Sequence, residues 1–299
     1  MRQILPAGAS AGLLFAALWA SASVATKLGV ESVHPLILAN VRFFIAGVGM
    51  LLFAYGVQRR RSSSGTRSLK NTWPTRPEFR RLTIFALLNT TIYLGAFVLA
   101  LKQVSAGIGS LSTATNPLFI ALLSALWLRR MPRRNELGGL LLGIVGVGVA
   151  TYPLLQNSYA TVGGLVILLI AMVSVSAATV YYAGIEWRLP TLVINGWQVL
   201  LGGILLLPFT LFFADFGASH YDGRFWASVL WLILPVSVAA LQLWFYLVRQ
   251  DAVRASLWLF LCPIFGFIYS YLLLGEPITL YTFAGTGLVI SGLWLGRKS

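Results

Sequence analysis

Long apolar stretches follow one another along the whole chain and are separated by short polar connections. A helix of roughly 20 residues crosses the ~30 Å hydrocarbon core of a bilayer, and each stretch has about that length. The pattern predicts ten transmembrane helices, near residues 5–27, 35–57, 82–101, 106–128, 137–155, 161–183, 191–214, 225–248, 255–274 and 279–296. The predicted fold class is therefore an all-α polytopic membrane protein.

Two segments of the chain, 100–128 and 246–274, repeat each other with a constant offset. The matched pairs are Ala106 and Ala252, Ser110 and Ser256, Leu111 and Leu257, Pro117 and Pro263, Phe119 and Phe265, Ser124 and Ser270, Leu126 and Leu272, and Leu128 and Leu274. Because five is odd, the second set of five helices enters the membrane from the opposite side. Inverted repeats of this kind are typical of secondary transporters. The predicted domains are a first half, 1–156, and a second, inverted half, 157–299.

The distribution of Lys and Arg predicts the orientation of the chain. With the N-terminus inside, 18 basic residues fall on the inner side and three, Lys27, Lys102 and Arg224, on the outer side. Both termini are therefore predicted to be cytoplasmic. Arg2 and the segment Ala20-Ser21-Ala22 also resemble a signal peptide with its cleavage site, but cleavage would leave the helix at 161–183 without its repeat partner.

Composition agrees with a chain that lies in a lipid bilayer. Hydrophobic residues make up 58% of the sequence. Charged residues make up 10%, against about 25% in soluble domains. The net charge of +14 lies in short runs between the apolar stretches, which argues against a nucleic-acid partner and favours the anionic inner leaflet. The single cysteine, Cys262, excludes an intrachain disulfide.

The sequence carries little that points to an enzyme. Gly8, Ser10 and Gly12 match the G-x-S-x-G pattern of serine hydrolases, which requires a strand-to-helix turn and His and Asp partners. Here the pattern opens a predicted membrane helix, and the only histidines, His34 and His220, fall at predicted outer loops. No zinc-protease motif, Cys/His cluster or phosphate-binding loop is present, so we expect no metal, no cofactor and no catalysis.

Glycines in the fifth and tenth predicted helices indicate close helix packing. They are Gly139, Gly143, Gly146, Gly285 and Gly287. Charged residues inside the spans are rare. None of the eight acidic residues falls within a predicted span, which argues against proton antiport coupled through a carboxylate. Arg42 is the clear intramembrane charge, and snorkelling or a carbonyl contact explains it as well as substrate binding does.

Neutral polar and aromatic residues gather at mid-depth in the first, third, fourth, sixth, eighth and ninth helices. The most prominent are Asn89, Tyr93, Asn116, Gln242, Tyr246 and Trp258, with Pro117 and Pro263 breaking two of the spans. Each alone is explained by an interhelical hydrogen bond or a core aromatic. Their convergence on six helices predicts a water-filled cavity with aromatic walls.

These features together resemble the drug/metabolite transporter superfamily, EamA type. The resemblance rests on the run Ala100–Ala106 with Pro117 in the first half, and on Ala252, Ser256, Pro263 and Gly275-Glu276-Pro277 in the second. It looks most similar to the aromatic amino-acid exporters. It implies a bacterial inner-membrane exporter with a basket-like cavity lined by those six helices, and with the fifth and tenth helices packed at the side. Arg129-Arg130-Met131-Pro132 departs from the family's usual Glu-Pro-like ending of the fourth helix.

The sequence thus predicts a transporter that exports amino acids, preferably aromatic, by rocking its halves around a midplane site. The expected substrate contacts are Asn89, Tyr93, Asn116, Gln242, Tyr246 and Trp258, and the expected bends are Pro117 and Pro263. The alternatives are an exporter of toxic organic cations or nucleosides, and a non-transporting scaffold or receptor. The expected partners are a small-molecule substrate and the lipid bilayer, with the chain a monomer or weak dimer.

Overall fold

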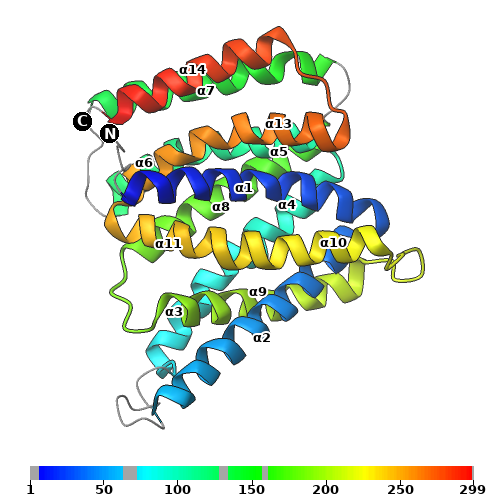
Figure 1. The fold of residues 1–299 in the computed structure, drawn as a ribbon, viewed down its shortest axis with the longest axis vertical. Helices are drawn as coiled ribbons and strands as arrows, with labels where there is room; N and C mark the ends of the chain where they lie inside the picture. Colours follow the sequence, from blue (N-terminus) through cyan, green and yellow to red (C-terminus); the bar gives the residue numbers. More distant parts are fainter. Residues whose placement is uncertain (1–6, 63–72, 128–133, 157–160, 298–299) are drawn as a thin grey trace, which may run out of the picture.

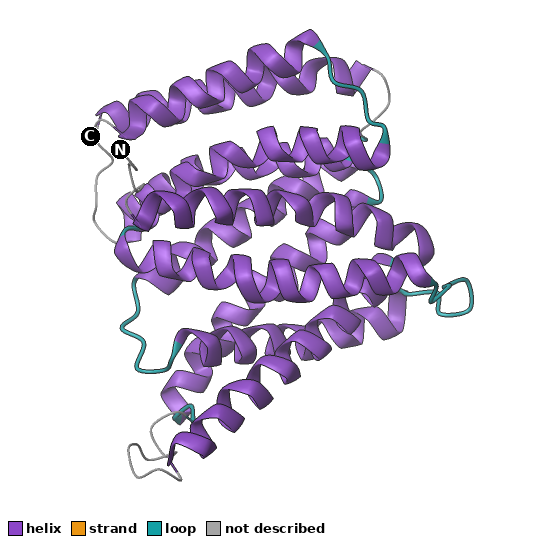
Figure 2. Ribbon diagram, in the orientation of Figure 1, coloured by secondary structure: helices purple, strands orange, loops and turns teal. Residues whose placement is uncertain are grey.

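The computed structural model describes residues 7–62, 73–127, 134–156 and 161–297, and its elements in these ranges are helices (Figure 2). Six predicted spans are single helices: α1 (Ala7–Ser32), α2 (Pro35–Ser62), α7 (Arg134–Gln156), α8 (Val162–Ala183), α9 (Thr191–Phe213) and α14 (Leu280–Arg297). Within the described ranges, eight helical spans are long and apolar enough to cross a bilayer, and α7 and α14 carry shorter apolar stretches. The prediction of an all-α, ten-helix membrane protein is confirmed.

The four remaining spans are each interrupted in the middle. The third consists of α3 (Arg76–Ala86), the π-helix η2 (Leu87–Ile92) and α4 (Tyr93–Leu101), and the eighth of α10 (Gly223–Trp231), the π-helix η4 (Leu232–Ala240) and α11 (Leu241–Gln250). The fourth consists of α5 (Ala106–Ser112), the 3₁₀ turn η3 (Thr113–Thr115) and α6 (Asn116–Trp127), and the ninth of α12 (Ala252–Ser256), η5 (Leu257–Leu261) and α13 (Cys262–Leu274). The two halves therefore carry the same kind of interruption in corresponding spans.

The helices form three groups in space. Figure 1 shows α7 and α14 side by side along one edge and α2 and α9 at the opposite edge, with the other spans between them. Glycine allows the close approach of α7 and α14, because a Cβ on Gly285 or Gly292 would collide with the backbone carbonyl of Gly146 or Gly139. The predicted role of Gly287 is wrong, since a Cβ there would meet no atom within 4 Å.

Several predicted boundaries move by three to six residues, and the shifts in the first and third spans affect acidic residues. The helix α1 continues to Ser32, so Lys27 and Glu31 lie in its last turns rather than at a loop. The third span begins at Arg76, six residues earlier than predicted, because Thr75 and Glu78 form a capping box at its N-terminus. The backbone N–H of Thr75 donates to Oε2 of Glu78 at 2.8 Å. These shifts bring Glu78 into the helical bundle, where its side chain is buried.

The surface of the bundle is apolar over the spans, as a lipid-facing surface requires. Large side chains such as Leu126, Phe212 and Leu280 are more than 70% exposed. The interior holds one main cluster of buried apolar residues that draws on both halves. Because lipid tails are as apolar as leucine, packing and interhelical hydrogen bonds, rather than hydrophobic burial, hold such helices together.

Candidate functional site in the bundle interior

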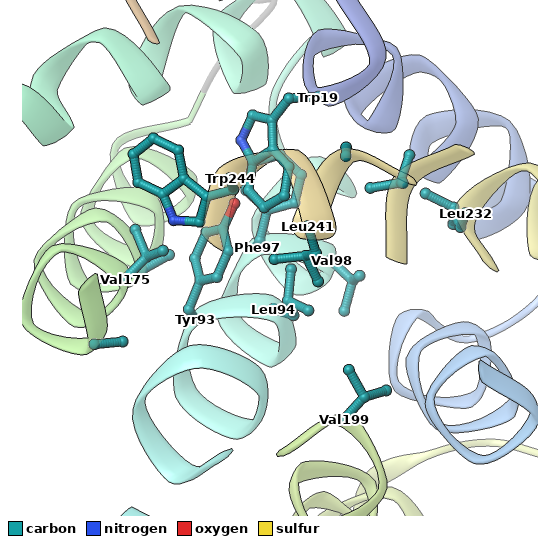
Figure 3. Close-up of a cluster of buried hydrophobic side chains, with 14 of the residues drawn as sticks. Trp19, Tyr93, Leu94, Phe97, Val98, Val175, Val199, Leu232, Leu241 and Trp244 are labelled. Carbon is teal, nitrogen blue, oxygen red and sulfur yellow. The ribbon is translucent and has the colours of Figure 1, made fainter. Parts of the chain in front are cut away.

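Aromatic side chains from three spans fill the centre of the bundle. Trp19 of α1 stacks on Tyr93 of α4 with ring centroids 6.4 Å apart, and the ring of Phe97 lies 6.0 Å from that of Tyr93. Figure 3 shows Trp244 of α11 beside Trp19 and Tyr93. Trp244 also stacks on Phe15 of α1, with ring centroids 4.9 Å apart. All five side chains are buried. The centre of the bundle thus holds flat apolar rings of the kind on which an aromatic group stacks.

A buried hydrogen-bond network runs beside these rings and links both halves. Arg42 of α2 donates from Nε to Oγ of Ser237 at 3.0 Å, and Asn195 of α9 donates to the Ser237 carbonyl at 2.7 Å. Gln198 donates to Oδ1 of Asn195 at 3.1 Å and accepts from Nδ2 of Asn89 at 3.2 Å. Ser237 and Asn89 belong to the two π-helices, η4 and η2. Short π segments occur frequently at functional sites, and here both contribute to one polar network.

The two prolines occupy equivalent places. Pro117 and Pro263 are each the second residue of a helix, α6 and α13, that follows a 3₁₀ turn. Proline lacks an N–H and its ring obstructs the preceding turn, so the helix tightens before it. The two broken spans meet where Oγ of Ser110 donates to the carbonyl of Cys262 at 2.8 Å, against Gly266, which leaves no room for a Cβ.

The predicted contact residues on the third span do not all face those on the eighth span. Tyr93 lies in the aromatic cluster, but Asn89 bonds to Gln198 of α9 rather than facing α11. Gln242 is partly buried, and its Nε2 is a buried atom without a hydrogen-bond partner among the described residues. Tyr246 is 49% exposed, whereas Tyr93 is buried, so the two tyrosines have different surroundings. Tyrosines near helix ends commonly lie at the membrane interface, which explains the exposure of Tyr246.

The other two predicted contacts lie in the interior. Asn116 is buried, and the hydroxyl of Ser176 approaches its Oδ1 at 3.5 Å. Trp258 lies against Gly12 of α1, where no Cβ would fit. Close packing against the helix opened by the G-x-S-x-G pattern agrees with the interpretation of those glycines as packing residues.

Sequence reasoning missed the interior role of Trp19, Trp244, Asn195 and Gln198. The signal for Trp244 was present, because Leu241, Trp244, Phe245 and Val248 have the i, i+3, i+4, i+7 spacing of one buried face, and all four are buried. A prediction based on polar groups, rather than on this apolar periodicity, gives Gln242 and Tyr246. These two residues lie beside that buried face.

At the predicted outer end, an acidic residue of the second half holds the first half. Glu276 accepts from the backbone N–H groups of Ala106 and Gly107 at 2.8 and 2.9 Å, which stabilises the N-terminus of α5. Gly275 turns the chain into this position with a φ of 67°, in the left-handed region that favours glycine. Lys27 donates to the carbonyls of Leu101 and Val104 at 2.9 and 2.8 Å beside it. We call the contact of Glu276 with α5 the outer link.

At the predicted inner end, an acidic residue of the first half holds the second half. Arg188, between α8 and α9, pairs with Oε2 of Glu78 at 2.8 Å and also donates from Nε to Oε1 at 3.1 Å. The hydrogen bond that Arg188 donates to Glu78 raises the pKa of the Arg188 guanidinium above its ordinary value. We call this contact the inner link. Glu276 and Glu78 therefore join the two halves at opposite ends of the bundle. The outer end also holds weaker contacts between the halves, the exposed pair of Glu31 with Arg224 and the hydrogen bond from Ser32 to Asp222.

Comparison with known proteins agrees with this architecture. The chain matches the EamA-like transporter family twice, over residues 6–152 and 162–296. An uncharacterized transporter of Archaeoglobus fulgidus is 26% identical over 93% of this chain and 94% of its own length. The uncharacterized transporter YoaV of Bacillus subtilis is 24% identical, with 93% and 92% covered. A solved crystal structure, 20% identical, superposes with a TM-score of 0.72 over 97% of both chains.

The fold and the comparisons define a multi-pass helical membrane protein of the transporter class, and not an enzyme. The chain belongs to the EamA-like transporter family, which the two matches cover over nearly its full length. The resemblance stated from the sequence is thereby confirmed at the level of the family. The finer similarity to aromatic amino-acid exporters stays a prediction, since the relatives' names carry no substrate.

Proposed function

We propose that this transporter exports amino acids, preferably aromatic ones, across a bacterial inner membrane with both termini in the cytoplasm. The observation that supports this cargo is the pairing of stacked rings with buried amides in one interior. Trp19 and Tyr93 offer faces to an aromatic side chain, while Asn89, Asn116 and Gln242 offer hydrogen bonds to a zwitterion. Trp258 completes the proposed contacts on the ninth span.

The proposed movement is a rocking of the two halves about this interior, with Pro117 and Pro263 as bends. Opening the outer end requires breaking the outer link, and opening the inner end requires breaking the inner link. Both links are formed in the structure. The proposal is therefore that one link breaks while the other holds, so that the interior is exposed to one side at a time.

The cargo is tested by counterflow in proteoliposomes that contain the purified chain. Vesicles loaded with unlabelled tryptophan or phenylalanine should accumulate the labelled amino acid transiently. Vesicles loaded with an organic cation should not accumulate that cation, because a buried Arg42 repels a cation in the interior. Vesicles loaded with a nucleoside should not accumulate it either, because it brings no carboxylate to Arg42. Saturable flux of the cations alone would replace the amino-acid proposal with its alternative, and the lack of any flux would favour a scaffold.

Gln242→Leu is the sharpest single test of the proposed contacts, because the substitution removes a buried amide nitrogen that has no partner among the described residues. A hydrogen bond to a charged group contributes roughly 1.5–3 kcal/mol, so the apparent substrate affinity should fall by about 10- to 150-fold. The matched control is Trp226→Ala, which truncates a side chain that is 46% exposed and should leave transport unchanged. Equal affinity in Gln242→Leu and the parent would show that Gln242 only packs helices together.

A further inference from the structure

Arg42 is a buried cation without a counter-charge in the described part of the chain. Its side chain is 3% exposed, and it lies seven residues inside α2, which begins at Pro35. At a rise of ~1.5 Å per residue, this places it about 10 Å from the outer end of that helix. An ionised side chain at membrane depth is costly, and such residues commonly mark a path for substrate or ions.

The acidic residues that could neutralise Arg42 are engaged at the ends of the bundle. Glu78 pairs with Arg188, and Glu31 lies 3.7 Å from Arg224. Glu276 holds the N-terminus of α5. The others with described partners accept backbone N–H groups next to them in sequence; they are Asp215, Asp222 and Asp251.

The guanidinium keeps part of its hydrogen-bonding capacity free. Nε donates to Oγ of Ser237 at 3.0 Å, and the guanidinium carbon lies 5.7 Å from the centre of the Phe43 ring. Among the described residues, no hydrogen bond is made by its two Nη nitrogens. Their parallel N–H groups match the two oxygens of a carboxylate, which is the geometry of the strongest arginine pairs.

The surroundings of Arg42 fit an organic anion rather than an inorganic one. Arg42 lies near Tyr93, and Tyr93 belongs to the buried aromatic cluster with Trp19. Tyr93 lies eight residues before the outer end of α4, or about 12 Å below it, so the two side chains have a similar depth. A carboxylate at Arg42 would therefore have flat apolar surface within reach of its substituent.

We propose that Arg42 is the receptor for the carboxylate of the transported solute. The solute class is a small organic monocarboxylate whose substituent packs on Tyr93 and Trp19. This inference rests on the proposed transport of amino acids, but it specifies the charged group that the protein recognises. It also explains why an unpaired arginine is tolerated at this depth, because the substrate brings the missing negative charge.

The test measures ligand binding by thermal stabilisation of the purified protein, with tryptophan and three indole compounds that each lack either its carboxylate or its amine. They are tryptophan, its amide, indole-3-propionate and tryptamine. Tryptophan and indole-3-propionate should stabilise the parent, and Arg42→Gln should bind both about 10- to 150-fold more weakly. The two compounds without a carboxylate carry only a positive charge, so they should bind the parent weakly and Arg42→Gln no more weakly than the parent.

Arg249→Gln is the matched control. Arg249 donates from Nε to the hydroxyl of Tyr182 at 2.9 Å and lies 5.9 Å from that ring, so its contacts resemble those of Arg42, but its side chain is exposed near the inner end of α11. This control should bind all four compounds like the parent. Arg42→Lys keeps the positive charge but loses the paired N–H groups of the guanidinium, so it should retain part of the affinity for the carboxylates. It also replaces Arg42→Gln as the test variant if Arg42→Gln does not fold.

The outcomes separate this inference from the proposed function. Equal binding of tryptophan by the parent and Arg42→Gln would overturn the inference but not the proposal of amino-acid transport. The role of Arg42 would then be limited to its hydrogen bond with Ser237. Indole-3-propionate bound without tryptophan would overturn amino-acid transport and support the carboxylate receptor. Failure of every carboxylate to stabilise the parent would overturn the inference.

Discussion

Replacing Glu276 by Gln should shift the protein towards a state that is open at the outer end. The carboxylate of Glu276 accepts two backbone N–H groups of α5, at 2.8 and 2.9 Å. Glutamine keeps one acceptor oxygen, but its amide group presents donors to the second N–H and it carries no charge for the helix N-terminus. The outer link is therefore weakened while the volume of the side chain is conserved.

The size of the shift follows from the two hydrogen bonds and their exposure. A hydrogen bond to a charged group contributes roughly 1.5–3 kcal/mol when buried, but Glu276 is half-buried, so the substitution should cost the closed outer end about 1–2 kcal/mol. That cost changes the ratio of open to closed molecules about 5- to 30-fold. A minor open state in the parent would become readily detectable in Glu276→Gln.

The assay measures the distance between two spin labels by pulsed electron paramagnetic resonance in lipid nanodiscs. The labels replace Lys102 in the first half and Leu280 in the second, both exposed at the outer end, in a background with Cys262→Ala. Glu276→Gln should add a population at longer distance. The control is Glu31→Gln at the same end, because Glu31 makes only an exposed ion pair with Arg224 at 3.7 Å. Identical distributions in Glu276→Gln and the parent would refute the outer link as a barrier to opening.

Three further predictions concern stability, coupling and topology. Asp222 accepts from the N–H of Phe225 at 2.8 Å, which holds the pKa of Asp222 below its ordinary value. Its contribution to folding stability is therefore present above about pH 4 and is lost as the pH falls through the lowered pKa. The difference in thermal denaturation midpoint between Asp222→Ala and the parent should therefore shrink in acid, and a constant difference would contradict the assignment. Amino-acid counterflow should persist when an ionophore collapses the pH gradient, whereas substrate-driven proton movement of fixed stoichiometry would refute uncoupled transport. A reporter fused after Ser299 or inserted near Ser63 should report a cytoplasmic location, and one near Ser158 or Gly217 a periplasmic one, with a periplasmic C-terminus contradicting the orientation.

The spans could be predicted from sequence because their length and hydropathy are dictated by the bilayer. The repeat could be predicted because the second copy preserves Pro117 as Pro263 and Ser110 as Ser256, residues that break and pack the helices in both halves. The matching interruptions of the third and eighth spans and of the fourth and ninth spans are a consequence of this repeat. Local backbone chemistry and helix periodicity therefore determine most of the fold.

The interior contacts were less accessible because they join residues far apart in the sequence. Nothing local to Glu276 indicates that it stabilises the N-terminus of α5, 170 residues earlier. The partner of Asn89 is Gln198 on α9, which is not among the helices that the sequence predicts to line the site. Tyr246 is 49% exposed, and sequence alone does not distinguish its two roles, since an aromatic residue near a helix end suits the membrane interface as well as a binding site.

The central claim is that the two halves expose the interior to one side at a time. It is tested by measuring the outer pair of labels and a second, inner pair, at Arg80 and Glu186, in Glu276→Gln and in Glu78→Gln. The account predicts that Glu276→Gln lengthens only the outer distance and Glu78→Gln only the inner distance. Lengthening of both distances together in either variant would contradict alternating access.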